Sequence, residues 1–321
     1  MKRIGLLLVV LIAMVGGGAF VANSALGEAT VEEDTPFQIS AGSSLSAVAT
    51  KLESEGLITS ADGFLMRARL FGSSDPIQAG EFNLTPGMDQ AAILRAFQSG
   101  DVIRRFVTIP EGMPSILVYE RLMATELLSG EIGVPPEGSI LPNTYAYERG
   151  QSRASVVAQM QRAMDTALAE EWSNRGPSTV VDNIRDAVIL ASIVEKETGK
   201  PEERRMVAGL YSNRVRTGML LQADPTIIYP ITKGKPLGRR IRQSEIASVN
   251  GYNTYTKVGL PDGPITNPGR ESIAAVLNPA QTSALFMVAD GTGGHKFAET
   301  NEEHNANVEE WYKLRRERGE M

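Results

Sequence analysis

Residues 186–198 read DAVILASIVEKET, an almost unbroken apolar run followed by two glutamates on either side of a lysine. Apolar side chains around nearly the whole circumference of a helix predict that the helix is buried at the centre of a domain. Carboxylates are almost never fully buried without a partner. Glu195 and Glu197 therefore either cap a structural element or are acids held in a dry cleft, where burial would raise the carboxyl pKa as proton donation requires.

Periodicity does not distinguish the two glutamates. In helical steps of about 100° per residue both project from apolar flanks of the run. A solvent-exposed helix end is an equally good interpretation of their position. Further sequence features are needed to choose between these readings.

Length and composition fit a globular protein that is long enough for two domains. The chain has 321 residues, of which 42% are hydrophobic and 22% charged. A net charge of −6 without a basic block makes nucleic acid an unexpected partner. The chain has no cysteine, which excludes disulfides, thiolate metal sites and cysteine nucleophiles.

Motifs for several common chemistries are missing. His295 and His304 are nine positions apart, which matches no zinc motif, so we expect no metal ion. The sequence has no nucleophile-elbow motif, phosphate-binding loop or dinucleotide fingerprint, and we expect no cofactor. Chemistry based on carboxylates and other polar side chains remains.

The N-terminus predicts export. Lys2 and Arg3 precede an uncharged apolar run at residues 4–22, whose nineteen residues at about 1.5 Å each nearly span a bilayer core of about 30 Å. Basic residues on the short side keep that end cytoplasmic. We expect a transmembrane anchor at residues 1–23 and a linker at residues 24–35. A cleaved signal peptide, cut at the small residues around Asn23, is the alternative.

One pattern recurs in the part of the chain that follows the linker. A short alternating strand, a turn with glycine at the sixth position and an amphipathic helix occur three times, although a chance match is the alternative. The pattern predicts small α+β units of about 25 to 45 residues. The three stretches are residues 37–52, 82–97 and 107–122, with Gly42, Gly87 and Gly112 in the turns.

The rest of the chain is predicted to be helical and rich in loops. Residues 130–150 contain many prolines and glycines and predict a loop that projects Tyr145 and Tyr147. We expect a buried strand at residues 285–289. Helices are expected at residues 152–175, 183–198, 202–217, 271–277 and 306–318.

Two segments carry candidate binding residues. In residues 218–230 polar and apolar side chains alternate, which predicts an extended segment with one polar face. Residues 251–269 form a long, well-punctuated loop of the kind that is uncommon unless functional. Aromatic, amide and hydroxyl groups suit a sugar, although a polar surface loop is the alternative. The candidates are Gln222, Asp224 and Thr226 in the first segment, and Tyr252, Asn253, Thr254, Tyr255 and Asn267 in the second.

Several long motifs together resemble the YceG-like family of endolytic murein transglycosylases. They are ASIVEKET at residues 191–198, NRVRTGMLLQADPTIIY at 213–229, YNTYTKVGLPDGPITNPG at 252–269, FMVADGTGGHKF at 286–297 and LPNTY at 141–145. The motifs occur in order and the resemblance covers almost the whole chain.

The resemblance implies a single-pass inner-membrane protein with a cytoplasmic N-terminus and a periplasmic catalytic domain. A LysM-like subdomain would occupy residues 36–105, and a larger mixed α+β catalytic domain residues 106–321. The family cleaves the β-1,4 bond between N-acetylmuramic acid and N-acetylglucosamine in nascent glycan strands. It leaves 1,6-anhydro ends, terminates strand growth and is expected to work beside peptidoglycan synthases. Its catalytic glutamate matches Glu195.

A lytic transglycosylase needs only one acid, because the muramoyl 6-hydroxyl replaces water as the nucleophile. Our hypothesis is that Glu195 protonates the glycosidic oxygen and then accepts the hydroxyl proton, with a pKa raised by its apolar helix. Glu197 is the secondary candidate. The alternatives are a non-catalytic, membrane-tethered scaffold that binds peptidoglycan, and a hydrolase in which a nearby carboxylate activates water.

Overall fold

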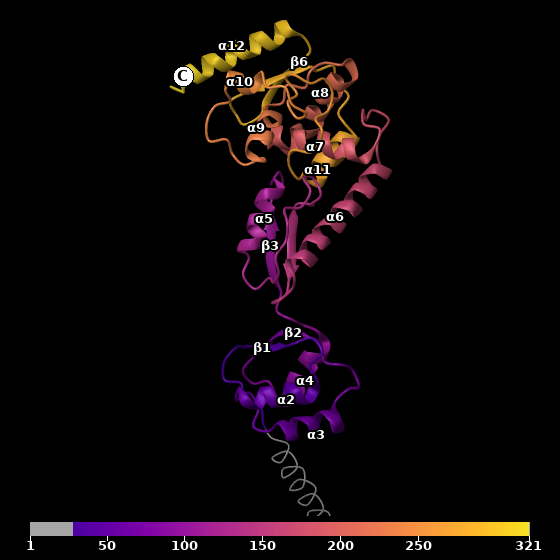
Figure 1. Cartoon of the computed structure of the whole chain (residues 1–321), viewed down its shortest axis with the longest axis vertical. Coiled ribbons are helices and arrows are strands. Elements are labelled where there is room, and N and C mark those ends of the chain that lie inside the picture. The colour runs from indigo at the N-terminus through magenta and orange to yellow at the C-terminus, as the bar shows by residue number, and fades with distance from the viewer. Residues whose placement is uncertain (1–27, 321) are drawn as a thin grey trace, which may run out of the picture. The chain divides into compact units, whose positions relative to one another are not determined.

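The computed structural model describes residues 28–320, a mixed α+β chain that divides into two compact units between Arg105 and Phe106 (Figure 1). Within the described residues no helix is both long and apolar enough to cross a bilayer. The predicted anchor at residues 4–22 lies outside this range.

The first unit is a two-stranded antiparallel sheet packed on helices. Phe37 and Phe82 face each other across the two strands and contact Phe97, at ring-centroid distances of 5.5 and 5.0 Å. All three rings are fully buried, so they form the centre of this core. The elements are β1 (Thr35–Ile39), α2 (Leu45–Ser54), α3 (Ala61–Phe71), β2 (Gly80–Leu84) and α4 (Gln90–Ser99).

The second unit begins with a strand pair that packs against two helices. Strand β3 (Arg105–Ile109) pairs with β4 (Asn143–Tyr147), and α5 (Ser115–Ala124) and α6 (Arg153–Ser173) complete this layer. The prediction of a loop projecting Tyr145 and Tyr147 was wrong. Both side chains lie on β4 and are buried, because every second residue of the strand points into the core.

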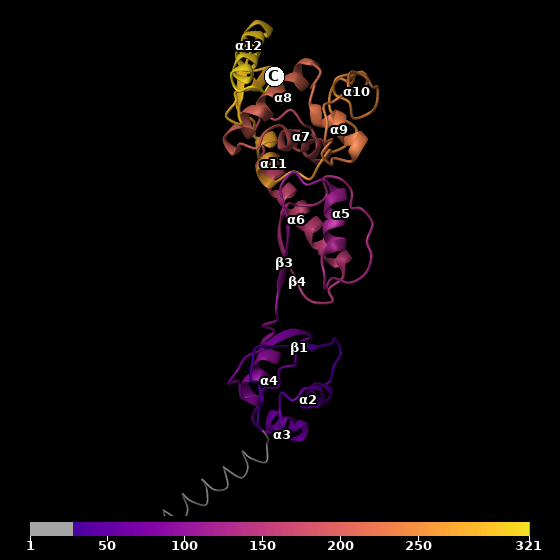
Figure 2. The same cartoon turned by 90° about the vertical axis from the view of Figure 1, so that its left-hand side faces the viewer.

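Helix α7 (Ile184–Glu197) is the centre of the remaining part of the second unit. All its side chains from Ala187 to Val194 are buried, and it contacts α8 (Arg204–Thr217), α9 (Asp224–Thr232) and α11 (Arg270–Leu277) (Figures 1 and 2). The sequence prediction of a central buried helix is confirmed. Around this group lie η1 (Pro201–Glu203), α10 (Gln243–Ile246), β5 (Phe286–Ala289), β6 (His295–Ala298) and α12 (Asn301–Glu317).

The three predicted strand–turn–helix units are present. The first two lie in the first unit and the third, β3 to α5, lies in the second. Their turn glycines Gly42, Gly87 and Gly112 have φ of 80°, 84° and 69°. Residues with a Cβ are strained in this left-handed region, which explains the shared glycine.

Two predictions about local structure need correction. Residues 218–230 are not extended throughout, because α9 begins at Asp224 with Pro225 in its first turn, where proline is tolerated. The polar face predicted for Gln222, Asp224 and Thr226 therefore does not form. Helix α12 begins at Asn301, earlier than predicted, because Thr300 and Glu303 form a capping box.

Candidate functional site

The carboxylate of Glu195 is held at the N-terminus of α11. Its Oε2 accepts hydrogen bonds from the backbone N–H of Gly269 at 3.0 Å and from the Ser272 hydroxyl at 2.7 Å. Gly269 is the N-cap of α11, and Ser272 lies in the first turn and is fully buried. The exposed N–H groups and dipole at a helix N-terminus stabilise negative charge. The carboxylate form of Glu195 therefore has a fixed orientation and a favourable electrostatic partner.

The other oxygen of Glu195 points towards the Gly112 turn. Within residues 28–320, Oε1 accepts no hydrogen bond, yet it is not among the buried unpaired atoms. A methyl group added at Gly112 would lie 3.7 Å from Oε1 and 3.4 Å from Cγ. The glycine thus leaves free space directly beside Oε1, where a proton could be delivered to a ligand.

A groove of about 450 Å³ passes this position. Residues 110–114 and Lys196 form the wall nearest Glu195, and Pro225 and Ile228 of α9 form another part. The lining combines apolar surface with the charged groups of Glu111, Lys196 and Lys235. Apolar surface with a few polar groups suits a saccharide, which has apolar ring faces and many hydroxyls.

Asn267 was predicted to contact substrate, but its side chain is buried and hydrogen-bonded within the protein. Its Nδ2 donates to Met113 O at 2.9 Å and Ser115 Oγ at 3.1 Å, and its Oδ1 accepts from Ile140 N–H at 3.0 Å. Its backbone carbonyl accepts from Gly112 N–H at 3.1 Å. With no exposed surface left for a sugar, Asn267 fixes the Gly112 turn relative to the loop that carries Gly269.

Three further predicted contacts are also buried and bonded within the protein. Asn253 donates to the carbonyls of Glu245, Ile246 and Ser248. The hydroxyls of Thr226 and Thr254 lie 2.8 Å apart, and Thr254 also accepts from a backbone N–H. All three side chains have no accessible surface, so they organise the loops and do not touch a ligand in this conformation.

The remaining candidates are accessible but lie apart from the lining of the groove. Gln222 is exposed, with φ of 52°, and Asp224 is exposed and accepts from the Tyr255 hydroxyl at 2.6 Å. Tyr252 packs on Tyr229 with ring centroids 5.0 Å apart. The structure therefore brings Asp224 and Tyr255 together.

Glu197 lies in a closed environment that differs from that of Glu195. Its Oε1 is buried without a hydrogen-bond partner. The pKa of its carboxyl is raised to about 7, first by burial and then by the charge of Asp224, while hydrogen bonding to Tyr211 and the charge of Arg214 lower it. Neither glutamate is among the residues that line the groove, but Gly112, which does line it, lies beside Glu195 Oε1.

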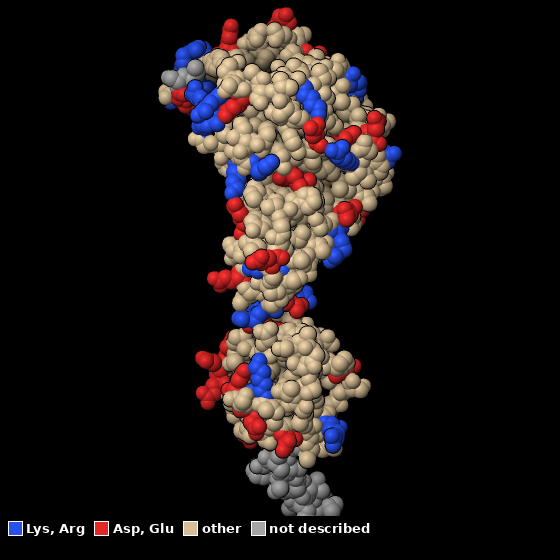
Figure 3. Space-filling model, in the orientation of Figure 1, with Lys and Arg blue, Asp and Glu red and all other residues tan. Residues whose placement is uncertain are grey.

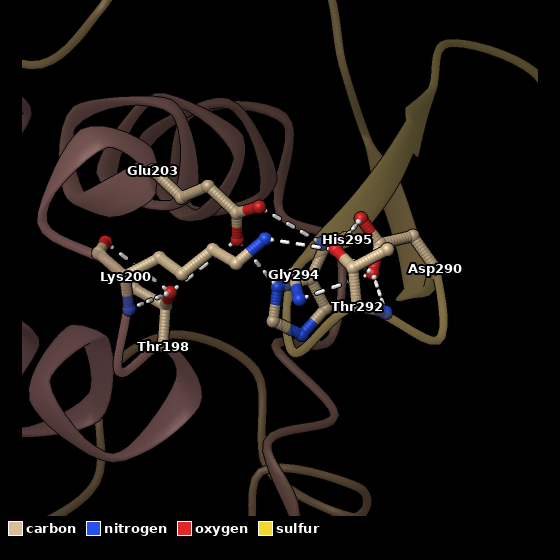
Figure 4. A network of polar contacts seen from close by, with 7 residues as sticks. All are labelled: Thr198, Lys200, Glu203, Asp290, Thr292, Gly294 and His295. Carbon is tan, nitrogen blue, oxygen red and sulfur yellow. Dashed lines mark hydrogen bonds and ion pairs between the residues drawn. The ribbon is translucent and has the colours of Figure 1, made fainter.

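A polar network that sequence reasoning missed holds the C-terminal end of α7 (Figure 4). Glu203 accepts from the His295 backbone N–H at 3.0 Å, and its Oε2 lies 2.8 Å from His295 Nδ1. Lys200 donates to Thr292 in the β5–β6 turn, where Asp290 accepts from Thr292 N–H and Gly294 N–H. The network joins the turn after α7 to the β5–β6 hairpin. The only sequence signal was the FMVADGTGGHKF motif.

On the face drawn in Figure 3, basic and acidic side chains are interspersed. Within residues 28–320 no group of three or more His, Cys, Asp or Glu side chains is arranged to hold a metal ion.

The chain is similar to known proteins over most of its length. The model of the YceG-like family matches residues 37–310. An endolytic murein transglycosylase of Bacillus subtilis (strain 168) is 27% identical, over 94% of this chain and 92% of the relative. One from Streptococcus pneumoniae serotype 2 is 28% identical over 84% of this chain, which spans 57% of that relative. A crystal structure of a yceG-like protein from Listeria monocytogenes has a TM-score of 0.54 and 26% identity, covering 86% of this chain and 99% of that one.

The space beside Oε1 can be tested with two matched glycine variants. Gly112→Ala and Gly87→Ala both place a methyl at positive φ, which costs about 1 kcal/mol in either unit. At Gly87 nothing lies within 4 Å of the added methyl, whereas at Gly112 it occupies the space beside Glu195. We expect Gly112→Ala to lower glycan cleavage by about tenfold or more, since small misplacements at a reacting centre are costly. Gly87→Ala should leave cleavage unchanged, and equal activities of the two variants would contradict this geometry.

The buried Glu197 predicts a specific dependence of stability on pH. A carboxyl whose folded pKa of about 7 exceeds its unfolded value of 4.5 makes the folded state bind more protons between those pH values. Stability should therefore fall as pH rises from 4.5 to 7, by about 3 kcal/mol at about 1.4 kcal/mol per pH unit. In Glu197→Gln this loss should be absent.

Urea unfolding followed by the fluorescence of Trp172 and Trp311, both in the second unit, would measure this difference. Glu202→Gln, which removes an exposed carboxylate from the neighbouring turn, is the control and should follow wild type. Parallel pH profiles for wild type and Glu197→Gln would show that Glu197 is not the titrating group.

Proposed function

The chain belongs to the YceG-like family, and from this we propose that it is a peptidoglycan lytic transglycosylase, a carbon–oxygen lyase that acts on glycan strands. The observation that carries the proposal is the geometry of Glu195. One carboxylate oxygen is held by the N-terminus of α11, and the other lies beside Gly112, which lines a groove. The names of the relatives from Bacillus subtilis and Streptococcus pneumoniae support the same activity.

The substrate is proposed to be the nascent glycan strand of peptidoglycan. Cleavage would break the β-1,4 bond between N-acetylmuramic acid and N-acetylglucosamine, leave a 1,6-anhydromuramoyl end and stop strand elongation. The length and order of the shared motifs, which include Glu195 in ASIVEKET, support this assignment. Peptidoglycan synthases, which extend such strands, are the expected partners.

Glu195 serves as acid and then as base. Protonated at Oε1, it donates its proton to the glycosidic oxygen while the bond from that oxygen to the muramoyl anomeric carbon breaks. The resulting carboxylate is stabilised by Gly269 N–H and the Ser272 hydroxyl. It then removes the proton of the muramoyl 6-hydroxyl, whose oxygen bonds to the anomeric carbon. Glu195 is regenerated in its protonated form, and no water is consumed.

A hydrolase remains the second candidate because another carboxylate is near. Glu111 lines the groove, and a methyl at Gly269 would lie 2.1 Å from its Oε1. Hydrolytic glycosidases use two carboxylates on opposite sides of the scissile bond. However, the Glu111 carboxylate is engaged within the protein, because its Oε2 lies 2.6 Å from Arg204. A hydrolase would produce reducing ends and depend on Glu111.

The non-catalytic parts are proposed to place the enzyme at the cell envelope. Residues 4–22 would anchor it in the inner membrane, with the N-terminus in the cytoplasm and the second unit in the periplasm. The order β1–α2–α3–β2 supports a LysM-like first unit that binds glycan. A scaffold that only binds peptidoglycan would use these parts alone and would not require Glu195.

Replacement of Glu195 by Gln tests the proposal. The variant keeps the size of the side chain but cannot donate the proton, so we expect cleavage of purified uncrosslinked glycan to fall by about 100-fold or more. Chromatography with mass spectrometry would measure both anhydro and reducing ends. Glu202→Gln should retain full activity, because its side chain is exposed on the turn after α7.

Three outcomes would separate the alternatives. Anhydro ends that depend on Glu195 but not on Glu111 support the lytic reaction. Reducing ends that disappear in Glu111→Gln would identify a hydrolase. Binding of glycan by wild type without any new ends would identify a scaffold.

A further inference from the structure

Helix α3 of the first unit presents a cluster of apolar side chains to solvent. The exposed fractions of Met66, Leu70 and Phe71 are 57%, 62% and 74%. Three large apolar residues this exposed within six positions are unusual, because soluble surfaces scatter such residues singly. We call these three residues the α3 patch.

The surroundings of the α3 patch resemble those of a helix that lies on a membrane. Met66 and Leu70 are four residues apart and therefore lie one above the other on the same face of α3. Helical steps of about 100° place Arg69 on one side of this pair and Arg67 on the other, between Leu70 and Phe71. An apolar face bordered by basic residues is typical of helices that insert into the boundary between headgroups and acyl chains.

The chain enters the first unit directly beside α3. Ala29 forms a β-bridge with Ile58, Glu28 N–H donates to Thr59 Oγ1 at 2.8 Å, and Ser60 caps α3. The start of the described chain is thus fixed next to the first turn of the helix. The position of the residues before Glu28 therefore also decides what lies next to α3.

The preceding residues connect this point to an apolar run through a short segment. Only residues 23–27 separate the run at 4–22 from the first described residue. Five residues reach about 20 Å at most, at about 3.6 Å each. If residues 4–22 span a bilayer, the start of α3 lies within about 20 Å of its surface.

We propose that the α3 patch docks on the outer leaflet of the membrane in which residues 4–22 are anchored. Met66, Leu70 and Phe71 insert at the boundary between headgroups and acyl chains, and Arg69 lies at the level of the lipid phosphates. The inference rests on the proposed anchor but not on the proposed catalytic activity. The partner is a lipid surface, preferably an anionic one, because the charged residues in the C-terminal half of α3 are both arginines.

The absence of cysteine makes the proposal directly testable in the full-length chain. Single variants Leu70→Cys and Met66→Cys would carry an environment-sensitive fluorophore, in vesicles of phosphatidylethanolamine and phosphatidylglycerol. Asn83→Cys is the matched control. Asn83 is exposed and lies on the side of β2 opposite Phe82 and Leu84, which face the core.

We expect the emission of labels at residues 66 and 70 to shift to shorter wavelength. Lipids that carry a nitroxide on the acyl chain should quench these two labels several-fold more than the label at residue 83. Flotation of the vesicles measures the anchor separately. A chain that floats but shows equal, weak quenching at all three positions overturns docking and leaves the anchor intact. Energy transfer between labelled copies without lipid quenching would assign the patch to a second copy and also overturn docking. A chain that fails to float overturns the anchor, and docking with it.

Discussion

The structure of the second unit depends on the contact between the end of α7 and the start of α11. A helix buried on every side can end in a carboxylate only if that carboxylate has a partner, and the Gly269 N–H and Ser272 hydroxyl supply it. Because both donors lie in the first turn of α11, the interaction also sets how the two helices pack. The loop that precedes α11 is held by Asn267, which in turn fixes the Gly112 turn. The contacts that pack the core therefore also fix the geometry of the site.

The two glutamates at the end of α7 have different roles: that of Glu197 is structural, and the one proposed for Glu195 is chemical. The carboxyl of Glu197 is buried near Tyr211 and Arg214, so we expect its ionisation to change the stability of the fold. Glu195 has one oxygen held and the other beside Gly112, which lines the groove, so we propose that a proton on this oxygen is passed to a ligand there. We considered an acid at this position because burial raises the pKa of a carboxyl. In the structure, it is the pKa of Glu197 that burial raises. For Glu195 the supporting argument is geometric.

Local periodicity was sufficient to predict α7 and the three strand–turn–helix units, because their signals lie within neighbouring residues. It failed at β4, where prolines and glycines nearby suggested a loop although Tyr145 and Tyr147 alternate as in a strand. It also failed at α9, because the alternation of polar and apolar residues at 218–230 was interpreted as an extended segment, whereas a helix begins at Asp224 with Pro225 in its first turn. The partners of Glu195 lie 74 and 77 positions away, a separation that no local pattern reveals. For the same reason Asn253, Thr254 and Asn267 looked like binding residues, whereas their amide and hydroxyl groups are used inside the protein.

The third strand–turn–helix unit shows how a folding motif becomes part of a site. At Gly42 and Gly87 an added methyl would meet nothing within 4 Å, so glycine there is required only by backbone conformation. At Gly112 the same positive φ is combined with contact to Glu195, so an added methyl would also fill the space beside that side chain. The backbone carbonyl of this residue also accepts a hydrogen bond from Lys196. In the first two units this turn only joins a strand to a helix. In the third unit it also leaves space beside Glu195 Oε1, which accepts no hydrogen bond within the described residues.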